Sequence, residues 1–369
     1  MTYEICAKCV MDTSDVCITF NDEGICNYCI DFENKISLYR FTKAQEEKNL
    51  IDLKSRILNN KIDKYDSLIG LSGGVDSSYL ALLAKKMELN PLCVHFDNGW
   101  NSDTALGNIQ KIIKNTGFDL ETYVIDWIEF KDLQRSFIKA GVVDIEMLTD
   151  HAIFASLFKI RKKNKIKTVL SGTNFVTEQN MPKYWSWNKM DSRNIKDIHK
   201  KYGSVKLKTF PFMNTFRWQL MKKFRLGGIF EEPLNVINYS KIKAIEELKK
   251  TFDWNYYGEK HYESVFTKFY QAYVLPYKFQ IDKRKVHYSD LLRNNEITRD
   301  DAISKINTPL YSNEDAFRTE KNYVLKKLGF SEVEFNSYMD QNPVLHSSYK
   351  TDKYFIDTLK YVFNKFLEK

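Results

Sequence analysis

The chain has 369 residues, of which 43% are hydrophobic and 14% aromatic, and its formal net charge is +8. This length and apolar content allow two or three domains with a proper core. The absence of any apolar run of about 18 residues excludes a membrane-spanning helix, and the N-terminal residues lack the basic and apolar regions of a secretion signal, so we expect a cytoplasmic protein. The moderate charge suits a polyanionic ligand but does not by itself indicate nucleic acid.

Four of the six cysteines form two pairs near the N-terminus. Two residues separate Cys6 from Cys9 and Cys26 from Cys29, and sixteen residues lie between the pairs. This spacing is typical of a four-thiolate zinc site, because a two-residue gap lets both sulfurs of a pair reach one tetrahedral ion. Metal binding would contribute folding free energy to so short a segment. A zinc ion with four thiolate ligands has no open coordination position, which predicts a structural role. An iron–sulfur cluster and unpaired thiols are the alternatives.

The other two cysteines, Cys17 and Cys93, are expected to pack as small apolar side chains. Residues 33–61 are charged and contain neither Pro nor Gly. They predict one or two connecting helices.

A glycine turn between a strand and a helix is the central feature of the chain. The apolar run 68–71 predicts a buried strand, and an amphipathic helix follows the turn at Ser72, Gly73 and Gly74. This arrangement directs backbone N–H groups and a helix N-terminus at an anion, and glycine lets the backbone approach closely. The turn has neither the lysine of a Walker A loop nor the spaced glycines of a Rossmann loop.

Residues 72–78, Ser-Gly-Gly-Val-Asp-Ser-Ser, resemble the PP-loop of the ATP pyrophosphatases, which split ATP into AMP and pyrophosphate. The resemblance implies that Asp76 helps to position Mg²⁺ against the pyrophosphate; simple charge pairing at a helix N-terminus is the alternative for this residue. An ordinary Ser/Gly-rich turn is the alternative for the motif. The implied ATP-binding residues of the loop are Leu71, Ser72, Gly73, Gly74, Val75, Asp76, Ser77 and Ser78.

Strand and helix signals alternate over residues 65–175, which predicts an α/β fold with a doubly wound parallel sheet. The PP-loop resemblance implies that this sheet is similar to that of the adenine nucleotide alpha hydrolases. Ligands of such sheets bind at the carboxyl ends of the strands, where residues 72–78, 97–100 and 171–174 should meet. The expected strands are 66–71, 92–96, 121–125 and 168–171, and the expected helices are 104–116, opening after Asp103 and closing at Gly117, and roughly 144–163.

By the same resemblance, backbone groups near His95 and Asp97 should hold adenine, and Gly172 and Thr173 should lie near the ribose and α-phosphate. An ordinary strand-end turn is the alternative for Asp97. Glu178, in the loop after the last strand, is a candidate general base or neighbour of the pyrophosphate and Mg²⁺.

Residues 183–225 hold twelve Lys or Arg residues, two acids and many aromatics. The stretch predicts either a nucleic-acid surface or a pocket for a multiply anionic sugar. A solvated helix with extended lysines is the alternative. The candidate substrate-binding residues near it are Asn174, Trp185 and Trp187.

From about residue 232 helical signals dominate, with capping boxes at 298–301 and 331–334 and a helix stop at Gly329. Residues 355–366 place apolar side chains on one helical face. Cations beyond the sheet could neutralise departing pyrophosphate, although each could equally be a surface charge. The candidates are Lys260 and Lys283 for catalysis, and His261, Lys268 and Arg284 for substrate binding.

Several segments together resemble the bacterial N-acetyl sugar amidotransferases: residues 6–15, 26–29, 72–78, 171–174 and 258–268. The resemblance covers nearly the whole chain, although Val16 and Glu259 depart from the residues expected in two turns. It implies a zinc-ribbon-like module at 1–40, a PP-loop domain with the basic substrate segment at 41–230, and a helical domain at 231–369. It also implies a surface-polysaccharide or flagellin-glycan pathway, in which the acetamido group of a sugar or nucleotide sugar becomes an acetamidino group through an adenylated intermediate.

The nitrogen source is the remaining question. Thr2 stands where an N-terminal-nucleophile glutaminase needs cysteine, and Cys93 lies within a predicted strand rather than on an exposed turn. By resemblance we therefore expect a separate glutaminase with an ammonia-channelling subunit. The rival readings are a tRNA-modifying PP-loop enzyme, disfavoured because only Cys93 is available in the nucleotide domain, and a binding module with a degenerate nucleotide fold.

Overall fold

The structure is a computed structural model that describes residues 3–179, 181–215, 218–219, 228–258, 262–353 and 358. A five-stranded sheet lies at its centre, in the order β3-β2-β1-β4-β5, and every neighbouring pair of strands is parallel. The strands are β1 (Ser67–Gly70), β2 (Pro91–Asp97), β3 (Asp119–Val124), β4 (Thr168–Leu170) and β5 (Ile229–Glu231). The predicted α/β fold with a parallel sheet is confirmed.

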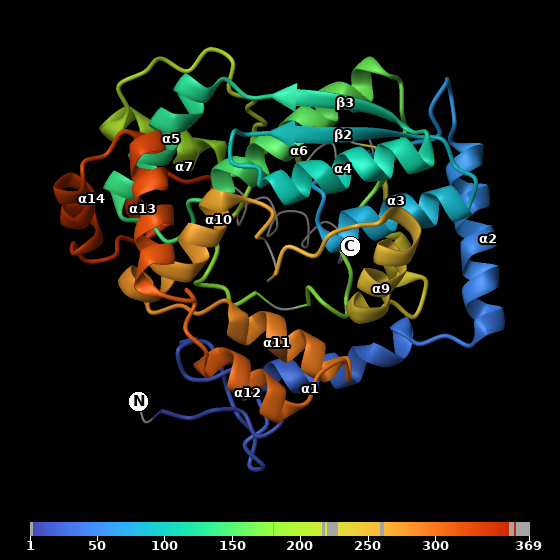
Figure 1. The fold of residues 1–369 in the computed structure, drawn as a ribbon, viewed down its shortest axis with the longest axis horizontal. Coiled ribbons are helices and arrows are strands. Elements are labelled where there is room, and N and C mark those ends of the chain that lie inside the picture. Colours follow the sequence, from blue (N-terminus) through green and yellow to red (C-terminus); the bar gives the residue numbers. More distant parts are fainter. Residues whose placement is uncertain are drawn as a thin grey trace.

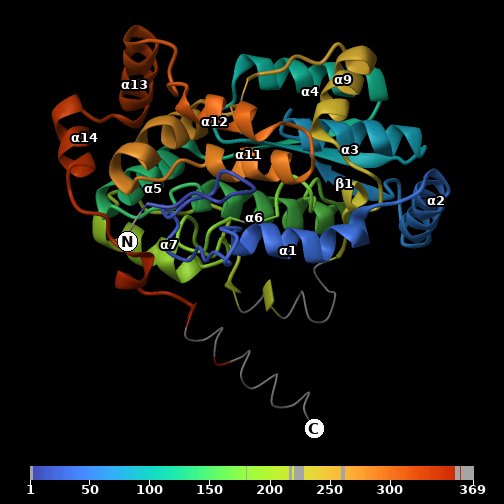
Figure 2. The ribbon, with the colours of Figure 1, turned by 90° about the horizontal axis from the view of Figure 1, so that it is seen from below.

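Helices cover both faces of this sheet (Figures 1 and 2). Side chains alternate along β1, so that Ile69 packs with one layer of helices and Leu68 with the other. The first layer contains α2 (Lys43–Asn59), α3 (Val75–Lys86), α4 (Asp103–Thr116) and α9 (Lys241–Phe252), and the second contains α6 (Met147–Lys163). This two-sided burial explains why the strands read as nearly continuous apolar runs.

The structure contains elements that were not predicted from the sequence, and the cap of one helix differs from the expectation. Residues 127–140 form a helix, α5 (Trp127–Ala140), with Asp126 as its N-cap and Gly141 at its end. The three-residue strand β5 is too short to give a pattern. The helix after β2 is capped by the Ser102 side chain, which accepts a bond from the Ala105 N–H, so its N-cap is Ser102 and not Asp103.

The C-terminal third is helical, as expected. The predicted capping box at Thr298 and the helix stop at Gly329 are confirmed, and Ser331 caps the next helix. The helices are α10 (Val265–Phe269), the π-helix η3 (Tyr270–Phe279), α11 (Arg284–Arg293), α12 (Arg299–Asn307), α13 (Glu314–Leu328) and α14 (Glu332–Met339); elsewhere lie α1 (Asn27–Ile36), α7 (Ser192–Tyr202) and the short 3₁₀ helices η1 (Ser37–Tyr39), η2 (Pro233–Asn235) and η4 (His346–Ser348). The apolar face predicted at 355–366 lies almost wholly outside the described residues.

The N-terminal segment packs on α11 and α12, which lie beside α1 in both views (Figures 1 and 2). Val10 clusters with Tyr288 and Ala302, and its N–H donates to Ser289 Oγ at 3.2 Å. One large apolar cluster joins the cysteine pairs to α5, α6, η3 and α13. The domain boundaries at 40 and 230 stay a prediction. Within the described residues, every helix is too short or too polar to cross a bilayer.

Candidate functional site

The turn after β1 is built so that glycine alone fits its second position. Gly73 has φ +80°, and a Cβ there would lie 2.4 Å from the carbonyl oxygen of Ala105 in α4. The close approach is fixed from the other side by Trp254, whose indole N–H donates to the Gly73 carbonyl and to Ser78 Oγ, both at 3.2 Å. The loop is therefore clamped between α4 and the segment after α9.

Replacing Gly73 with Ala is expected to distort this loop. The new methyl would strain a left-handed backbone and collide with α4, at a cost of about 1–3 kcal/mol in the free energy of unfolding. Thermal unfolding measures this loss, and ATP binding should weaken with it. Gly107→Ala in α4 is the matched control, because nothing lies within 4 Å of a Cβ there and alanine favours a helix interior by roughly 0.5–1 kcal/mol. Equal melting temperatures for the two variants would contradict the clamp.

Two tyrosines meet the start of α3. The Val75 N–H donates to the Tyr257 hydroxyl at 3.2 Å, and the Tyr239 hydroxyl donates to Asp76 Oδ1 at 2.5 Å. Burial, followed by the charge of Asp76, raises the pKa of Tyr239 well above its ordinary value, and Glu178 adds to the same shift. Tyr239 thus stays a hydrogen-bond donor that holds the Asp76 carboxylate in place at the helix N-terminus. Sequence reasoning missed both tyrosines.

The loop after β4 lies against the loop after β1, as expected for strands whose carboxyl ends share one edge. A Cβ at Gly172 would lie 3.4 Å from main-chain and side-chain atoms of Asp76. The Ser171 hydroxyl donates to Thr173 Oγ1 at 2.9 Å, and Asn174 Oδ1 accepts from the Thr177 N–H at 2.9 Å. The two predicted loops therefore come together, while their roles in holding ribose and phosphate stay predictions.

The end of β2 forms a small polar network. Ring atom Nδ1 of His95 lies 3.1 Å from the Leu71 carbonyl, so it donates, and Asn101 Nδ2 contacts His95 Nε2 at 3.2 Å and Asp97 Oδ1 at 3.0 Å. Asp97 Oδ1 also accepts from the Gly99 N–H at 2.8 Å. The network ties β1 to β2 beside the loop. Adenine binding by the backbone at this point remains a prediction.

A cavity of about 470 Å³ opens beside these strand ends, which is within the usual ~300–1,000 Å³ of small-molecule pockets. One side is formed by the ends of β1 and β2, including the predicted Leu71, Ser72 and His95. The lining also includes a group of charged and polar side chains, here called the polar wall: Glu146, Thr149, Asp150, Lys189, Gln271 and Lys283. The cavity therefore joins the predicted nucleotide loop to a polar wall.

Ion pairs order the polar wall. Lys283 Nζ contacts Glu146 Oε2 at 2.9 Å, which also accepts from Gln271 at 3.2 Å. Lys189 Nζ contacts Asp144 Oδ2 at 2.7 Å and Asp150 Oδ2 at 3.1 Å. Of this wall, the sequence singled out only Lys283. The others were hidden because Glu146 and Asp150 lie within a predicted helix, and Lys189 was one of twelve cations in the basic stretch.

Other predicted substrate residues lie away from this cavity. Trp185 is buried in the large apolar cluster, and the Trp187 ring stacks on His346 with centroids 5.1 Å apart. Lys268 pairs with Glu320 at 2.5 Å. Arg284 pairs with Asp282 and donates to carbonyl groups at the end of α12. Lys260 and His261 lie outside the described residues.

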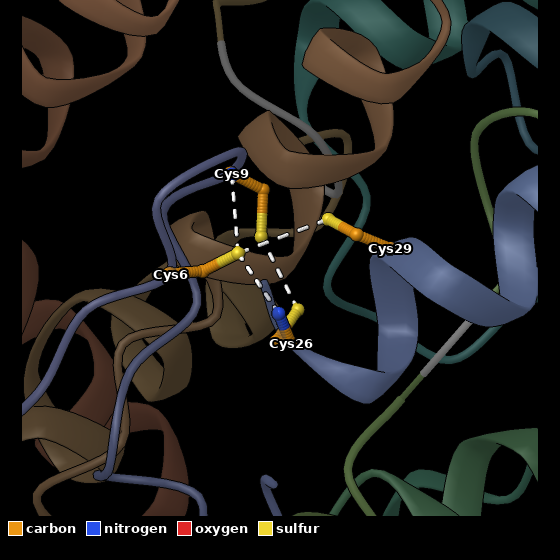
Figure 3. Close-up of side chains that lie close together, drawn as sticks. All are labelled: Cys6, Cys9, Cys26 and Cys29. Atoms are coloured by element: carbon orange, nitrogen blue, oxygen red, sulfur yellow. Dashed lines mark hydrogen bonds between the residues drawn. The ribbon is translucent and has the colours of Figure 1, made fainter. Parts of the chain in front are cut away.

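The four cysteines of the predicted metal site converge (Figure 3). All four are buried, and their sulfurs lie within 4.8 Å of one another, with Cys9–Cys26 at 3.7 Å and Cys6–Cys29 at 4.0 Å. A tetrahedral ion with about 2.3 Å zinc–sulfur bonds places its sulfurs about 3.8 Å apart. The predicted convergence of the four cysteines is confirmed, and the separations of their sulfurs would suit zinc in a closed, structural site.

Donors around the sulfurs suit thiolates. N–H groups of Cys9 and Cys26 point at Cys6 Sγ at 3.4 and 3.2 Å. The buried guanidinium of Arg293 lies 3.5 Å from Cys29 Sγ and 3.9 Å from Cys9 Sγ. Contacts with the Cys26 and Cys29 sulfurs, with the nearby Arg293 charge, lower the pKa of Cys9 below its ordinary value. Arg293 belongs to α11, so the metal site and the C-terminal helices form one unit; nothing in the cysteine spacing pointed to it.

Parts of the chain are similar to known proteins. Residues 263–363 match the family model described as LPS biosynthesis protein WbpG-like, C-terminal domain. An uncharacterized protein from Methanocaldococcus jannaschii is 29% identical over 170 residues, which are 45% of this chain and 58% of that protein. The chain thus spans little more than half the length of that relative.

Among solved structures, an NMN synthetase from Francisella tularensis overlaps 58% of this chain and 94% of its own, with 15% identity and a TM-score of 0.31. Because the TM-score is so low, this similarity supports no conclusion about fold or activity.

Proposed function

We propose that this protein is an ATP-dependent amidotransferase of surface-polysaccharide biosynthesis, which converts the acetamido group of a sugar or nucleotide sugar into an acetamidino group. The observation that carries the proposal is the composition of the cavity. The cavity is lined by Leu71 and Ser72 of the predicted ATP loop, and five of its other lining residues lie within the WbpG-like region 263–363. Those five are Glu263, Ser264, Thr267, Gln271 and Lys283. The WbpG-like region therefore contributes to the same cavity as the predicted ATP loop, which supports the proposal.

The chemistry proceeds in two steps. The amide oxygen attacks the α-phosphorus of ATP, the bond to the β-phosphate oxygen breaks, and pyrophosphate leaves. Ammonia then attacks the adenylated carbon, AMP leaves with the former amide oxygen, and an amidine remains. N–H groups at the start of α3 receive the pyrophosphate charge, and Mg²⁺, held with the help of Asp76, would neutralise it further. No protein nucleophile is required, because positioning and electrostatics supply the acceleration.

A tRNA-thiolating enzyme fits this chain less well. Such chemistry needs a reactive cysteine in the nucleotide domain, and Cys93 on β2 is fully buried. Burial raises the pKa of its thiol to about 12, which keeps it protonated and a poor nucleophile at neutral pH. The aromatics Trp185 and Phe210 of the basic stretch point into the core rather than offering stacking faces to bases.

Incubation with ATP, Mg²⁺, ammonium chloride and a panel of UDP-linked N-acetyl sugars tests the proposal. We expect equal amounts of AMP and pyrophosphate, and an amidine product detected by mass spectrometry. Ammonium should support turnover, and glutamine alone should not, because a separate glutaminase is expected to supply ammonia. Release of ADP and orthophosphate would contradict the reaction, and turnover on glutamine alone would contradict the partner. Stimulation of AMP release by tRNA, with none by the sugars, would favour the thiolation alternative.

A further inference from the structure

One face of α6 forms part of the cavity wall. Thr149, Asp150, Ile153 and Leu157 of α6, together with its N-cap Glu146, all line the cavity. Asp150, Ile153 and Leu157 follow one another at three and four residues, which places them along a single helical face. Asp150 lies in the first turn of this helix. Its side chain is 40% exposed, so within this wall its carboxylate is open to a bound molecule.

The neighbouring carboxylates are already committed. Asp144 is 2% exposed, accepts two contacts from Lys189 and also accepts from the N–H groups of Met147 and Trp187. Glu146 binds Lys283 and Gln271. Glu263 lies on the nucleotide side, with Oε1 3.4 Å from a Cβ built at Gly74. The Asp150 carboxylate lines the cavity and pairs with Lys189 at 3.1 Å.

We infer that Asp150 is the general base of the second step, taking a proton from ammonia as its nitrogen attacks the adenylated carbon. The assignment rests on the proposed function. The new C–N bond forms with the nitrogen lone pair, one proton passes from that nitrogen to the Asp150 carboxylate, and the C–O bond breaks with its electron pair leaving on AMP. Lys189, held by Asp144, is a positioning residue that orients the carboxylate.

The charges around Asp150 suit this role. The protein packed around the partly exposed Asp150 side chain desolvates it and so raises the pKa of its carboxyl; the charges of Asp144 and Glu146 add to the rise, while Lys189 opposes it. Burial also tends to raise the pKa of Asp144, but the charges of Lys189 and Lys283 lower it by more, so that this pKa lies below its ordinary value. Neighbouring carboxyls with opposite shifts are typical of an acid–base pair with divided roles. A base must be unprotonated, so the ammonia step should fail as pH falls through the raised pKa of Asp150.

The test compares wild type with Asp150→Asn and Asp150→Ala, using ATP and the UDP-linked N-acetyl sugar that gives most pyrophosphate. General-base loss is expected to slow ammonia-dependent amidine formation by about 100-fold or more. The first-turnover release of pyrophosphate, which precedes the proton transfer, should change far less. With rates expressed per concentration of free ammonia at each pH, the acidic limb of the wild-type profile should vanish in Asp150→Asn. Sodium formate should restore part of the activity of Asp150→Ala.

The matched control is Asp315→Asn, because Asp315 is also an acid in the first turn of a helix, α13, but is exposed and lies outside the cavity lining. An Asp150→Asn enzyme that forms amidine as fast as Asp315→Asn overturns the assignment. Equal loss of both steps, with an unchanged pH profile and no formate rescue, also overturns it in favour of a structural role. If the wild type releases no pyrophosphate with any N-acetyl sugar, the proposed function itself fails, and the base assignment falls with it.

Discussion

Asp76→Asn is expected to reduce substrate-dependent pyrophosphate release by about 1,000-fold, because a metal-bound or charge-stabilised leaving group loses several kcal/mol when a ligand carboxylate is neutralised. Asparagine keeps the size of the side chain and still accepts the bond from the Tyr239 hydroxyl. The loss should therefore arise in catalysis rather than in folding. Radiolabelled ATP with separation of AMP and pyrophosphate measures the rate, and a melting curve checks the fold.

Tyr239→Phe is the matched control for this substitution. It leaves the Asp76 charge in place and removes only the donor that orients it. We expect a loss of about tenfold, since a hydrogen bond to a charged group is worth about 1.5–3 kcal/mol and part of it is replaced by water. If Asp76→Asn retains wild-type rates, the loop does not use this carboxylate to manage the pyrophosphate charge. If Tyr239→Phe is the more damaging of the two, the tyrosine acts in its own right.

Removal of the predicted zinc is expected to disorganise the N-terminal segment and inactivate the enzyme. Four buried thiolates without an ion repel one another, and structural zinc contributes about 10–16 kcal/mol in small zinc-binding peptides. The segment also holds α11 and α12: Asp12 pairs with Lys285 at 2.5 Å, and Arg299 donates to the Cys6 carbonyl at 3.1 Å. Because Lys283 directly precedes α11 and reaches the cavity, loosening that helix should withdraw a cation from the polar wall.

Metal analysis of the purified protein should therefore find one zinc per chain, and Cys26→Ser should lower both metal content and melting temperature. Cys17→Ser is the control, since Cys17 lies between the two pairs but is exposed and outside the cluster. A Cys26→Ser protein that melts like Cys17→Ser would show that the cluster does not stabilise the fold. Visible absorbance from iron and sulfide would instead show that the four cysteines bind an iron–sulfur cluster.

Features that depend on neighbouring residues could be predicted from the amino-acid sequence. The apolar runs and glycine turns determined the parallel sheet, and two-residue gaps determined that the cysteines could meet around one ion. The edge where residues 72–78 and 171–174 meet followed as well, because parallel strands share a direction. These are consequences of local backbone geometry and of side-chain periodicity, which adjacent residues carry in full.

The tertiary structure decided which distant side chains meet. Tyr239 reaches Asp76 across 163 residues, and Lys283 reaches Glu146 across 137. Only in the tertiary structure is it seen that Trp185 packs in the core and that Arg293 lies beside the cysteine sulfurs. No local sequence pattern predicts such pairings, because they form where segments from separate parts of the chain pack together. A lysine on a solvated helix also has the same sequence pattern as a lysine that lines a cavity.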